Sequence, residues 1–391
     1  MIKVKQSIKK ILYSKKLRLK PYILMESNPD FADNTKAVYD EIIKRGLNLK
    51  YKVIWAVNDK QKYKYIKTKN VRFINRTGSI LNKVKFAYYN IFSKYIIDCN
   101  KYIEKLNKNQ IRIFLGHGMP IKVARKYMGE MGTIDYIAST SELFDDVYID
   151  CYKVKSNQIK ILGYPRNDVL FNNKQEKIIF PEIKRNKTII WMPTYRNHNN
   201  KDNTNRKSFT YGIPCVSDEN ELVNINQKLN ELNELLLVRL HPAEDLTNIK
   251  QMELSNIRLL DDKVLERENA TIYDILPQTD ALITDYSSVY YDYLLLDKMI
   301  GMTIPDFDEY KKGTELFFKY ITDFMTNLPA EYIFNYDGLI KFIENVQINN
   351  DNYKEQREKK TKSYHKYIDG QSSKRVVDLM LENEEKLRHE E

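Results

Sequence analysis

The sequence predicts an α/β protein with two doubly wound parallel domains, and three observations lead to that prediction. Short apolar runs of strand length alternate with segments of helical periodicity along most of the chain. The chain has 391 residues, more than a typical single domain. A polar, non-periodic stretch at residues 171–187 is typical of a linker. We therefore expect a first domain at residues 21–172, a second at 188–340 and a C-terminal helical segment at 341–391.

The first 20 residues form a basic segment, in which eight residues are Lys or Arg and none is acidic. Ile8, Ile11 and Leu12 fall at helical spacing, so a helix here would carry one apolar face among lysines. This pattern is typical of an interfacial helix that associates with an anionic membrane surface. A solvated basic extension, or a helix docked on the protein's own surface, fits the same residues.

Strands and helices alternate through the first domain. Apolar runs bounded by turn residues predict strands, and longer amphipathic stretches predict helices. The predicted strands are 22–26, 52–57, 71–74, 95–99, 111–115, 135–139 and 158–162, and the predicted helices are 34–44 and 80–89. This alternation favours a mainly parallel sheet with helices packed on it.

A histidine framed by glycines follows the strand at 111–115. Gly116 and Gly118 let the backbone approach a ligand closely, and Pro120 suits the start of a helix. His117 is thus expected at the carboxyl end of a strand, where open α/β sheets bind ligands. A structural histidine is the alternative, but the glycine frame favours a functional one.

The second domain repeats the pattern and ends its strands with polar residues. The predicted strands are 188–192, 235–240, 256–260, 281–283 and 299–303, and the predicted helices are 221–232, 290–296 and the region beyond 339, which ends in a charged tail expected to be solvated. Arg196 follows the first of these strands, and Arg239 and His241 lie at the end of the second. Residues 197–218 predict a loop over a cleft between the domains.

The turn between the strand at 281–283 and the following helix carries two adjacent serines, Ser287 and Ser288. Backbone N–H groups without helical partners and the positive end of the helix dipole point out of such a turn, which favours a phosphate-binding site. The alternative is that Asp285 or Ser287 only caps the helix. Two cations, two hydroxyls and a helix terminus can together hold a diphosphate without a metal.

Composition limits the remaining possibilities. The formal net charge of +11 favours an anionic partner, and we find no internal repeat and no nucleic-acid-binding module. Three widely spaced cysteines argue against a disulfide framework or a zinc site, and no apolar run is long enough to span a bilayer. Asp306 and Asp308 could ligate a divalent ion, but a solvated turn is the preferred interpretation, so no cofactor is required and a divalent metal is not predicted.

Five ordered motifs carry a resemblance to a known family. They are Gly116–Pro120, Gly163–Asp168, Pro193–Arg196, Arg239–Pro242 and Thr284–Ser288. Together they resemble the CDP-glycerol:poly(glycerophosphate) glycerophosphotransferase family, the teichoic acid primases and polymerases. The resemblance covers residues 22–303. It implies a GT-B fold, with two Rossmann-like doubly wound domains and an intervening cleft, here preceded by the short basic segment.

The resemblance also implies a reaction and its participants. A polyol phosphate passes from CDP-glycerol or CDP-ribitol to a hydroxyl of a lipid-linked (polyprenyl-diphosphate) teichoic acid or capsule acceptor, and CMP is released. Family members work as peripheral proteins at the cytoplasmic face of the membrane. His117 matches the proposed catalytic base, and His241 matches a histidine essential for activity. Positions that match CDP-polyol-binding residues are His117, Gly118, Met119, Pro120, Ile121, Arg196, Arg239, Leu240, His241, Ser287, Ser288 and Asp292.

The sequence departs from the family at Met119, where many relatives have threonine, so hydroxyl contacts are not expected there. Two other interpretations stay open. A GT-B glycosyltransferase that uses a nucleotide sugar would share the fold and the diphosphate site. A non-catalytic binding module would be compatible with the positive charge and the 29 tyrosines.

Overall fold

The chain forms two compact units. The computed structural model describes residues 17–100, 103–119, 134–172, 180–181, 183, 185–195, 209, 211–240, 249, 252–268, 270–313 and 324–389. The first unit comprises residues 1–119, 125–171 and 365–391, and the second comprises 120–124 and 172–364. The C-terminal residues are therefore divided between the units, and the predicted domain boundaries remain predictions.

The first unit is built on a seven-stranded sheet in the order β3-β2-β1-β4-β5-β6-β7. Every neighbouring pair of these strands is parallel. The strands are β1 (Lys20–Glu26), β2 (Lys52–Val57), β3 (Val71–Asn75), β4 (Ser93–Asp98), β5 (Ile111–Phe114), β6 (Tyr136–Ser139) and β7 (Ile159–Ile161). Their burial on both faces explains why they consist of nearly continuous apolar runs.

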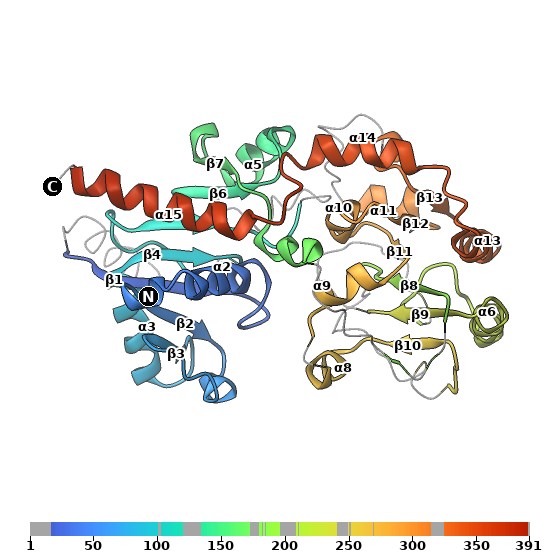
Figure 1. Ribbon diagram of the computed structural model, residues 1–391, viewed down its shortest axis with the longest axis horizontal. Helices are drawn as coiled ribbons and strands as arrows, with labels where there is room; N and C mark the ends of the chain where they lie inside the picture. Colours follow the sequence, from blue (N-terminus) through green and yellow to red (C-terminus); the bar gives the residue numbers. More distant parts are fainter. Residues whose placement is uncertain are drawn as a thin grey trace. The chain divides into compact units, whose positions relative to one another are not determined.

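Helices cover both faces of this sheet. On one face, α2 (Asp33–Lys44) and α15 (Ser372–His389) pack side by side, and Val38, Val377 and Met380 join the buried core there (Figure 1). On the other face, Tyr89 of α3 (Ile80–Phe92) packs into a second cluster. The other described helices of this unit are α5 (Asp145–Tyr152) and the 3-10 helices η1 (Leu47–Leu49), η2 (Lys60–Tyr63), η3 (Glu142–Phe144), η4 (Ser156–Gln158) and η5 (Pro165–Phe171).

The second unit has a six-stranded parallel sheet in the order β10-β9-β8-β11-β12-β13. The strands are β8 (Lys187–Trp191), β9 (Glu234–Val238), β10 (Ile257–Leu259), β11 (Ala281–Thr284), β12 (Met299–Thr303) and β13 (Glu331–Ile333). This order is that of a Rossmann sheet. The first three strands are added toward one edge and the next three toward the other, so the strand order reverses between the first and fourth strands.

Helices α6 (Glu219–Leu232) and α13 (Tyr336–Gln347) pack against each other and close one core of the second unit (Figure 1). Helix α10 (Val289–Leu294) contacts α14 (Lys354–Tyr364). The other described helices are α8 (Asp262–Arg267), α9 (Ile272–Ile275), η6 (Leu276–Gln278), α11 (Phe307–Gly313) and α12 (Phe324–Asn327). Two parallel Rossmann-like sheets confirm the predicted α/β fold class.

The structure corrects two expectations from the sequence, on a loop and on a turn, and shows elements that were not predicted. Helix α15 buries Val376, Val377 and Met380 completely, whereas the side chains of the charged end at 384–391 lie outside the described residues, so its solvation stays a prediction. Part of the predicted loop at 197–218 is core, since the described residues Ile213 and Val216 are buried. Asp306 is buried and accepts a hydrogen bond from the Tyr286 hydroxyl, while the exposed Asp308 belongs to α11, so these two carboxylates do not share a solvated turn. The short strand β13 and helices α5 and α8 were not predicted.

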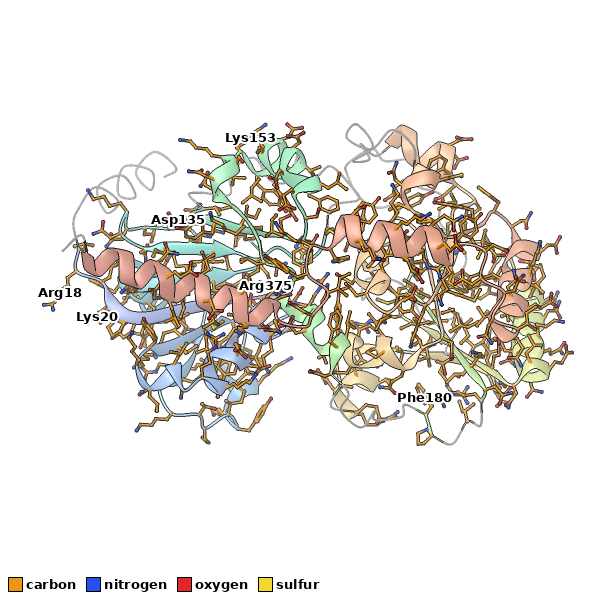
Figure 2. The ribbon with its side chains drawn as sticks, turned by 45° about the horizontal axis from the view of Figure 1, so that its top comes forward. Arg18, Lys20, Asp135, Lys153, Phe180 and Arg375 are labelled. Carbon is orange, nitrogen blue, oxygen red and sulfur yellow. The ribbon has the colours of Figure 1, made fainter. Side chains whose placement is uncertain are left out.

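The basic segment at residues 1–20 is described only from Leu17 onward, and the chain enters β1 at Lys20 (Figure 2). Within the described part of the chain, no helix combines the length and apolar character that crossing a membrane would require.

Candidate active site

The predicted site residues lie at the carboxyl ends of strands in both sheets. In each Rossmann-like sheet, the carboxyl ends of the strands on either side of the reversal point form the usual ligand-binding edge. In the first unit, the strand order reverses between β1 and β4. His117 follows β5, the neighbour of β4. The second unit reverses between β8 and β11, whose carboxyl ends carry Thr194 and Ser287.

His117 is held in a loop with two unusual backbone conformations. Gly116 has φ 65° and Gly118 has φ 140°, both in the region that side-chain-bearing residues rarely adopt. The sequence motif therefore has a conformational cause: two glycines let the chain turn sharply on either side of one histidine. The residue remains exposed to solvent at the carboxyl edge, while protein atoms surround much of its ring.

Buried polar side chains anchor this loop from two other elements. Asn34, in the first turn of α2, donates from Nδ2 to the Gly116 carbonyl at 2.9 Å. Arg166, in η5, donates from Nη1 to the His117 carbonyl at 2.8 Å and to Asp33 Oδ1 at 3.0 Å. The Arg166 backbone N–H in turn donates to Asn34 Oδ1 at 3.0 Å, which closes a ring of contacts around the loop.

The environment of His117 lowers its pKa below the usual value. The main cause is desolvation by the surrounding protein, which disfavours the charged imidazolium. The Asp33 carboxylate opposes this effect, the Arg166 guanidinium adds to it, and a hydrogen bond to the Cys99 carbonyl favours the protonated ring. A lowered pKa keeps the imidazole neutral near pH 7, which is the state that a general base requires.

Met119 points away from solvent. Its side chain is 1% exposed, and the Thr140 hydroxyl donates to its sulfur at 2.7 Å. The Met119 side chain is therefore part of the core of the first unit. Many relatives have a threonine hydroxyl at position 119. Here the neighbouring hydroxyl belongs to Thr140, which contacts the Met119 sulfur.

In the second unit, the strand-to-helix turn predicted as a phosphate site lies at the reversal point. Ser287 and Ser288 are partly exposed, and Ser288 immediately precedes α10. The capping alternative is not favoured for Asp285, whose carboxylate instead accepts from the Thr194 N–H at 2.9 Å. Ser287 Oγ lies 3.5 Å from the Val289 N–H, a long contact that leaves the hydroxyl able to bind a ligand.

Arg239 and Leu240 follow β9, directly beside β8. Arg239 donates to the Leu260 carbonyl at 2.7 Å and pairs with the exposed Asp262 at 2.5 Å. An anionic ligand would therefore have to compete with Asp262 for this guanidinium. The Leu240 side chain is 6% exposed and belongs to the core of the second unit, so only its backbone could contact a ligand.

Asp292 does not face solvent. It is 0% exposed, and the Tyr273 hydroxyl donates to its Oδ2 at 2.7 Å. This carboxylate ties α9 to α10 and so supports the turn that carries the serines.

Several predicted residues cannot be compared with the structure. Pro120, Ile121, Arg196 and His241 lie outside the described residues. His117 belongs to the first unit, while the serines and Arg239 belong to the second, so the cleft that would unite them stays a prediction. Among the described residues, no group of three or more His, Cys, Asp or Glu side chains could hold a metal ion.

Sequence reasoning missed two residues of the His117 loop environment. Asp33 and Asn34 lie far from His117 in sequence, and at the start of a predicted helix they look like ordinary capping residues. In the sequence, Arg166 stands out only as a member of the Gly163–Asp168 motif. One feature of the sequence could have indicated that Arg166 lies near His117. Each of these residues follows a predicted strand of the same domain.

Comparisons with known proteins agree with these observations. The model of the family described as CDP-Glycerol:Poly(glycerophosphate) glycerophosphotransferase matches residues 9–382. A teichoic acid poly(glycerol phosphate) polymerase of Bacillus spizizenii is 25% identical over 388 residues, covering 91% of this chain and 90% of that protein. A teichoic acid ribitol-phosphate primase of the same species is 25% identical over 244 residues, covering 60% of this chain and 55% of that protein.

A solved structure shares the fold. A histidine variant of the wall teichoic acid polymerase TagF, soaked with CDPG, matches with a TM-score of 0.72 and 22% identity over 98% of this chain and 95% of that one. The predicted GT-B class, with two Rossmann-like domains, is thus confirmed. The family match spans nearly the whole chain, and its curated relatives are enzymes of polyol-phosphate transfer. This chain therefore belongs to the CDP-glycerol:poly(glycerophosphate) glycerophosphotransferase family.

Proposed function

We propose that the chain transfers glycerol phosphate or ribitol phosphate from a CDP-polyol to a hydroxyl of a lipid-linked teichoic acid or capsule acceptor. The observation that carries the proposal is the position of His117, which is exposed between two glycines at the carboxyl edge of a sheet. Its pKa is lowered, which favours the neutral imidazole. Family membership supplies the reaction class, and the relative soaked with CDPG supports a CDP-polyol as donor.

In the proposed step, the acceptor oxygen attacks the phosphorus that bears the polyol. The new P–O bond forms as the bond to the bridging oxygen breaks, so CMP leaves with that oxygen, and His117 takes the acceptor's proton. Ser287, Ser288 and the adjoining backbone N–H groups are suited to the donor phosphates. Arg196, Arg239 and His241 would offset charge on the leaving phosphate.

We further propose that the protein works as a peripheral protein at the cytoplasmic membrane face, where a lipid-linked acceptor would be presented. The support is the basic, acid-free character of residues 1–20 and the overall charge of +11. Both favour an anionic surface.

The decisive experiment measures CMP release from CDP-glycerol and CDP-ribitol in parallel, with a soluble linkage-unit analogue as acceptor. UDP- and GDP-sugars serve as controls. Release from one CDP-polyol identifies the reaction and the polyol together, and product length distinguishes a primase from a polymerase. Turnover of a nucleotide sugar, with no release from either CDP-polyol, would instead establish a glycosyltransferase.

A further inference from the structure

We propose that Asp33, Asn34 and Arg166 act together as positioning residues for His117, holding its loop and balancing the charge around its imidazole. The inference rests on the proposed function of His117 as the base and extends it to groups that act through His117. All four residues belong to the first unit.

The mechanical part of the inference follows from the glycines. A loop with glycine on both sides of the base is intrinsically pliant, so it needs anchors from outside to keep one geometry. Asn34 holds the Gly116 carbonyl at 2.9 Å, and Arg166 holds the His117 carbonyl at 2.8 Å. Two successive carbonyls are therefore fixed by side chains that are almost fully buried.

The two anchors are also fixed to each other. The Arg166 N–H donates to Asn34 Oδ1 at 3.0 Å, and the Asn34 N–H donates to Asp33 Oδ1 at 2.7 Å. Because the same Asp33 oxygen accepts from Arg166 Nη1 at 3.0 Å, displacement of one member would move the others. The start of α2 and η5 thus hold the loop as one unit.

The electrostatic part follows from opposite charges. The Asp33 carboxylate raises the pKa of His117 and the Arg166 guanidinium lowers it, so the two effects offset while the ion pair is intact. The other contributions come from desolvation, which lowers the pKa, and from the Cys99 carbonyl after β4, which raises it. Removal of the Asp33 carboxylate or of the Arg166 guanidinium would leave the opposite charge near His117 unbalanced, and the pKa of His117 would shift accordingly.

The first test measures the pKa of His117 directly, by NMR titration of the full chain labelled at histidine. The chain has five histidines, and the spectrum of His117→Gln identifies the relevant signal. We expect Asp33→Asn to lower the pKa of His117 and Arg166→Gln to raise it, because each variant removes one of two opposing charges.

A matched control uses Arg45, which pairs with Glu41 and Asp378 at the other end of α2. Arg45→Gln should leave the pKa of His117 unchanged. Shifts in the same direction for Asp33→Asn and Arg166→Gln, or no shift in either, would overturn the inference. If Arg166→Gln does not fold, Asp33→Asn still decides, because a purely structural residue would not lower the pKa.

The second test separates position from charge. Arg166→Lys keeps the positive charge, but its ammonium is one bond short of the position of Nη1, the atom that donates to both Asp33 and the His117 carbonyl. We expect kcat to fall about tenfold or more with little change in KM for the CDP-polyol, and the pH profile to stay in place. An unchanged kcat would remove Arg166 from the positioning role.

The two proposals fail in different ways. If the wild-type chain releases no CMP, the proposed function fails, while the NMR titration still reports on the balance of charge. If CMP is released but the variants leave the pKa of His117 unmoved, the function stands and the positioning inference fails.

Discussion

His117 illustrates how single residues at this site combine flexibility with constraint. The glycines allow a conformation that exposes the imidazole, and Asn34 and Arg166 limit the freedom that the glycines introduce. Desolvation then favours the neutral ring. These properties suit the proposed role of His117, which is to accept a proton from an acceptor hydroxyl.

Replacing His117 by alanine should lower turnover by about a hundredfold or more, because general base catalysis contributes about that much. Binding of the CDP-polyol should persist, since the serines and Arg239 of the second unit are unchanged. The measurement is CMP release together with nucleotide binding by calorimetry. Unchanged turnover would show that another group accepts the proton.

Glu234 offers a prediction on pH dependence. This residue begins β9 and is 0% exposed, and burial, with a smaller contribution from Asp280, raises its pKa to about 7. Between the usual carboxyl pKa and about 7, the unfolded chain loses this proton while the folded chain keeps it. The contribution of Glu234 to stability is therefore present at low pH and is lost as the pH rises through that window.

Glu234→Gln should remove this loss, because glutamine does not titrate. Urea unfolding at about pH 5 and about pH 7.5 should show a smaller difference in stability for the variant than for the wild type. Equal pH dependence in both proteins would mean that the Glu234 carboxyl ionises without penalty in the folded state.

At the scale of elements, the Gly163–Asp168 motif connects three parts of the first unit. Arg166 reaches the His117 loop, while the Asp168 carboxylate accepts from the N–H groups of Ser372 and Ser373 at 2.8 and 2.7 Å. Arg375 of α15 (Figure 2) donates to the Leu162 carbonyl at 2.8 Å, just before the motif. The motif thus joins the candidate base to the last helix of the chain.

Gly163 is required where this motif approaches α15. It has φ 77°, and a Cβ atom added there would clash with Ser372 Oγ. A larger residue would force the Ser372 side chain to move and would also strain the backbone. The glycine therefore permits the close contact between η5 and the helix.

Asp168→Ala should destabilise the first unit by about 1 kcal/mol, the typical effect of removing a carboxylate that caps first-turn N–H groups. Urea unfolding followed by circular dichroism measures this change. Lys374→Ala, at an exposed position of the same helix, is the control and should have an effect below about 0.5 kcal/mol. Equal effects from the two substitutions would contradict the capping role.

At the scale of the whole molecule, the net charge of +11 and the basic N-terminal segment bear on membrane association. Deletion of residues 1–16 removes no residue of β1, which begins at Lys20. The Leu17 carbonyl, which accepts from Asn107 Nδ2 at 3.1 Å, would be retained.

Deletion of residues 1–16 should weaken binding to anionic vesicles and leave the fold intact, since it removes six lysines from one short segment. Cosedimentation with anionic vesicles, and with zwitterionic vesicles as a control, measures the effect at low and high salt. Undiminished binding that is insensitive to salt would mean that this segment is not the membrane contact.

The sequence by itself determined the two parallel sheets and most strand positions. Buried parallel strands must be apolar on both faces, so each produced a recognisable apolar run, and Gly116 and Gly118 indicated the exposed His117. The motifs were also sufficient to predict the family. Local patterns sufficed because a parallel strand covered on both faces must be apolar along its length, and a backbone with positive φ favours glycine.

Only the tertiary structure decided which distant residues act together. It joined Asp33, Asn34 and Arg166 to His117, and it packed α15 in the first unit rather than in solvent. It also placed the side chains of Met119, Leu240 and Asp292 in buried positions. These outcomes depend on long-range contacts between elements, and periodicity along the chain carries no information about which surfaces meet.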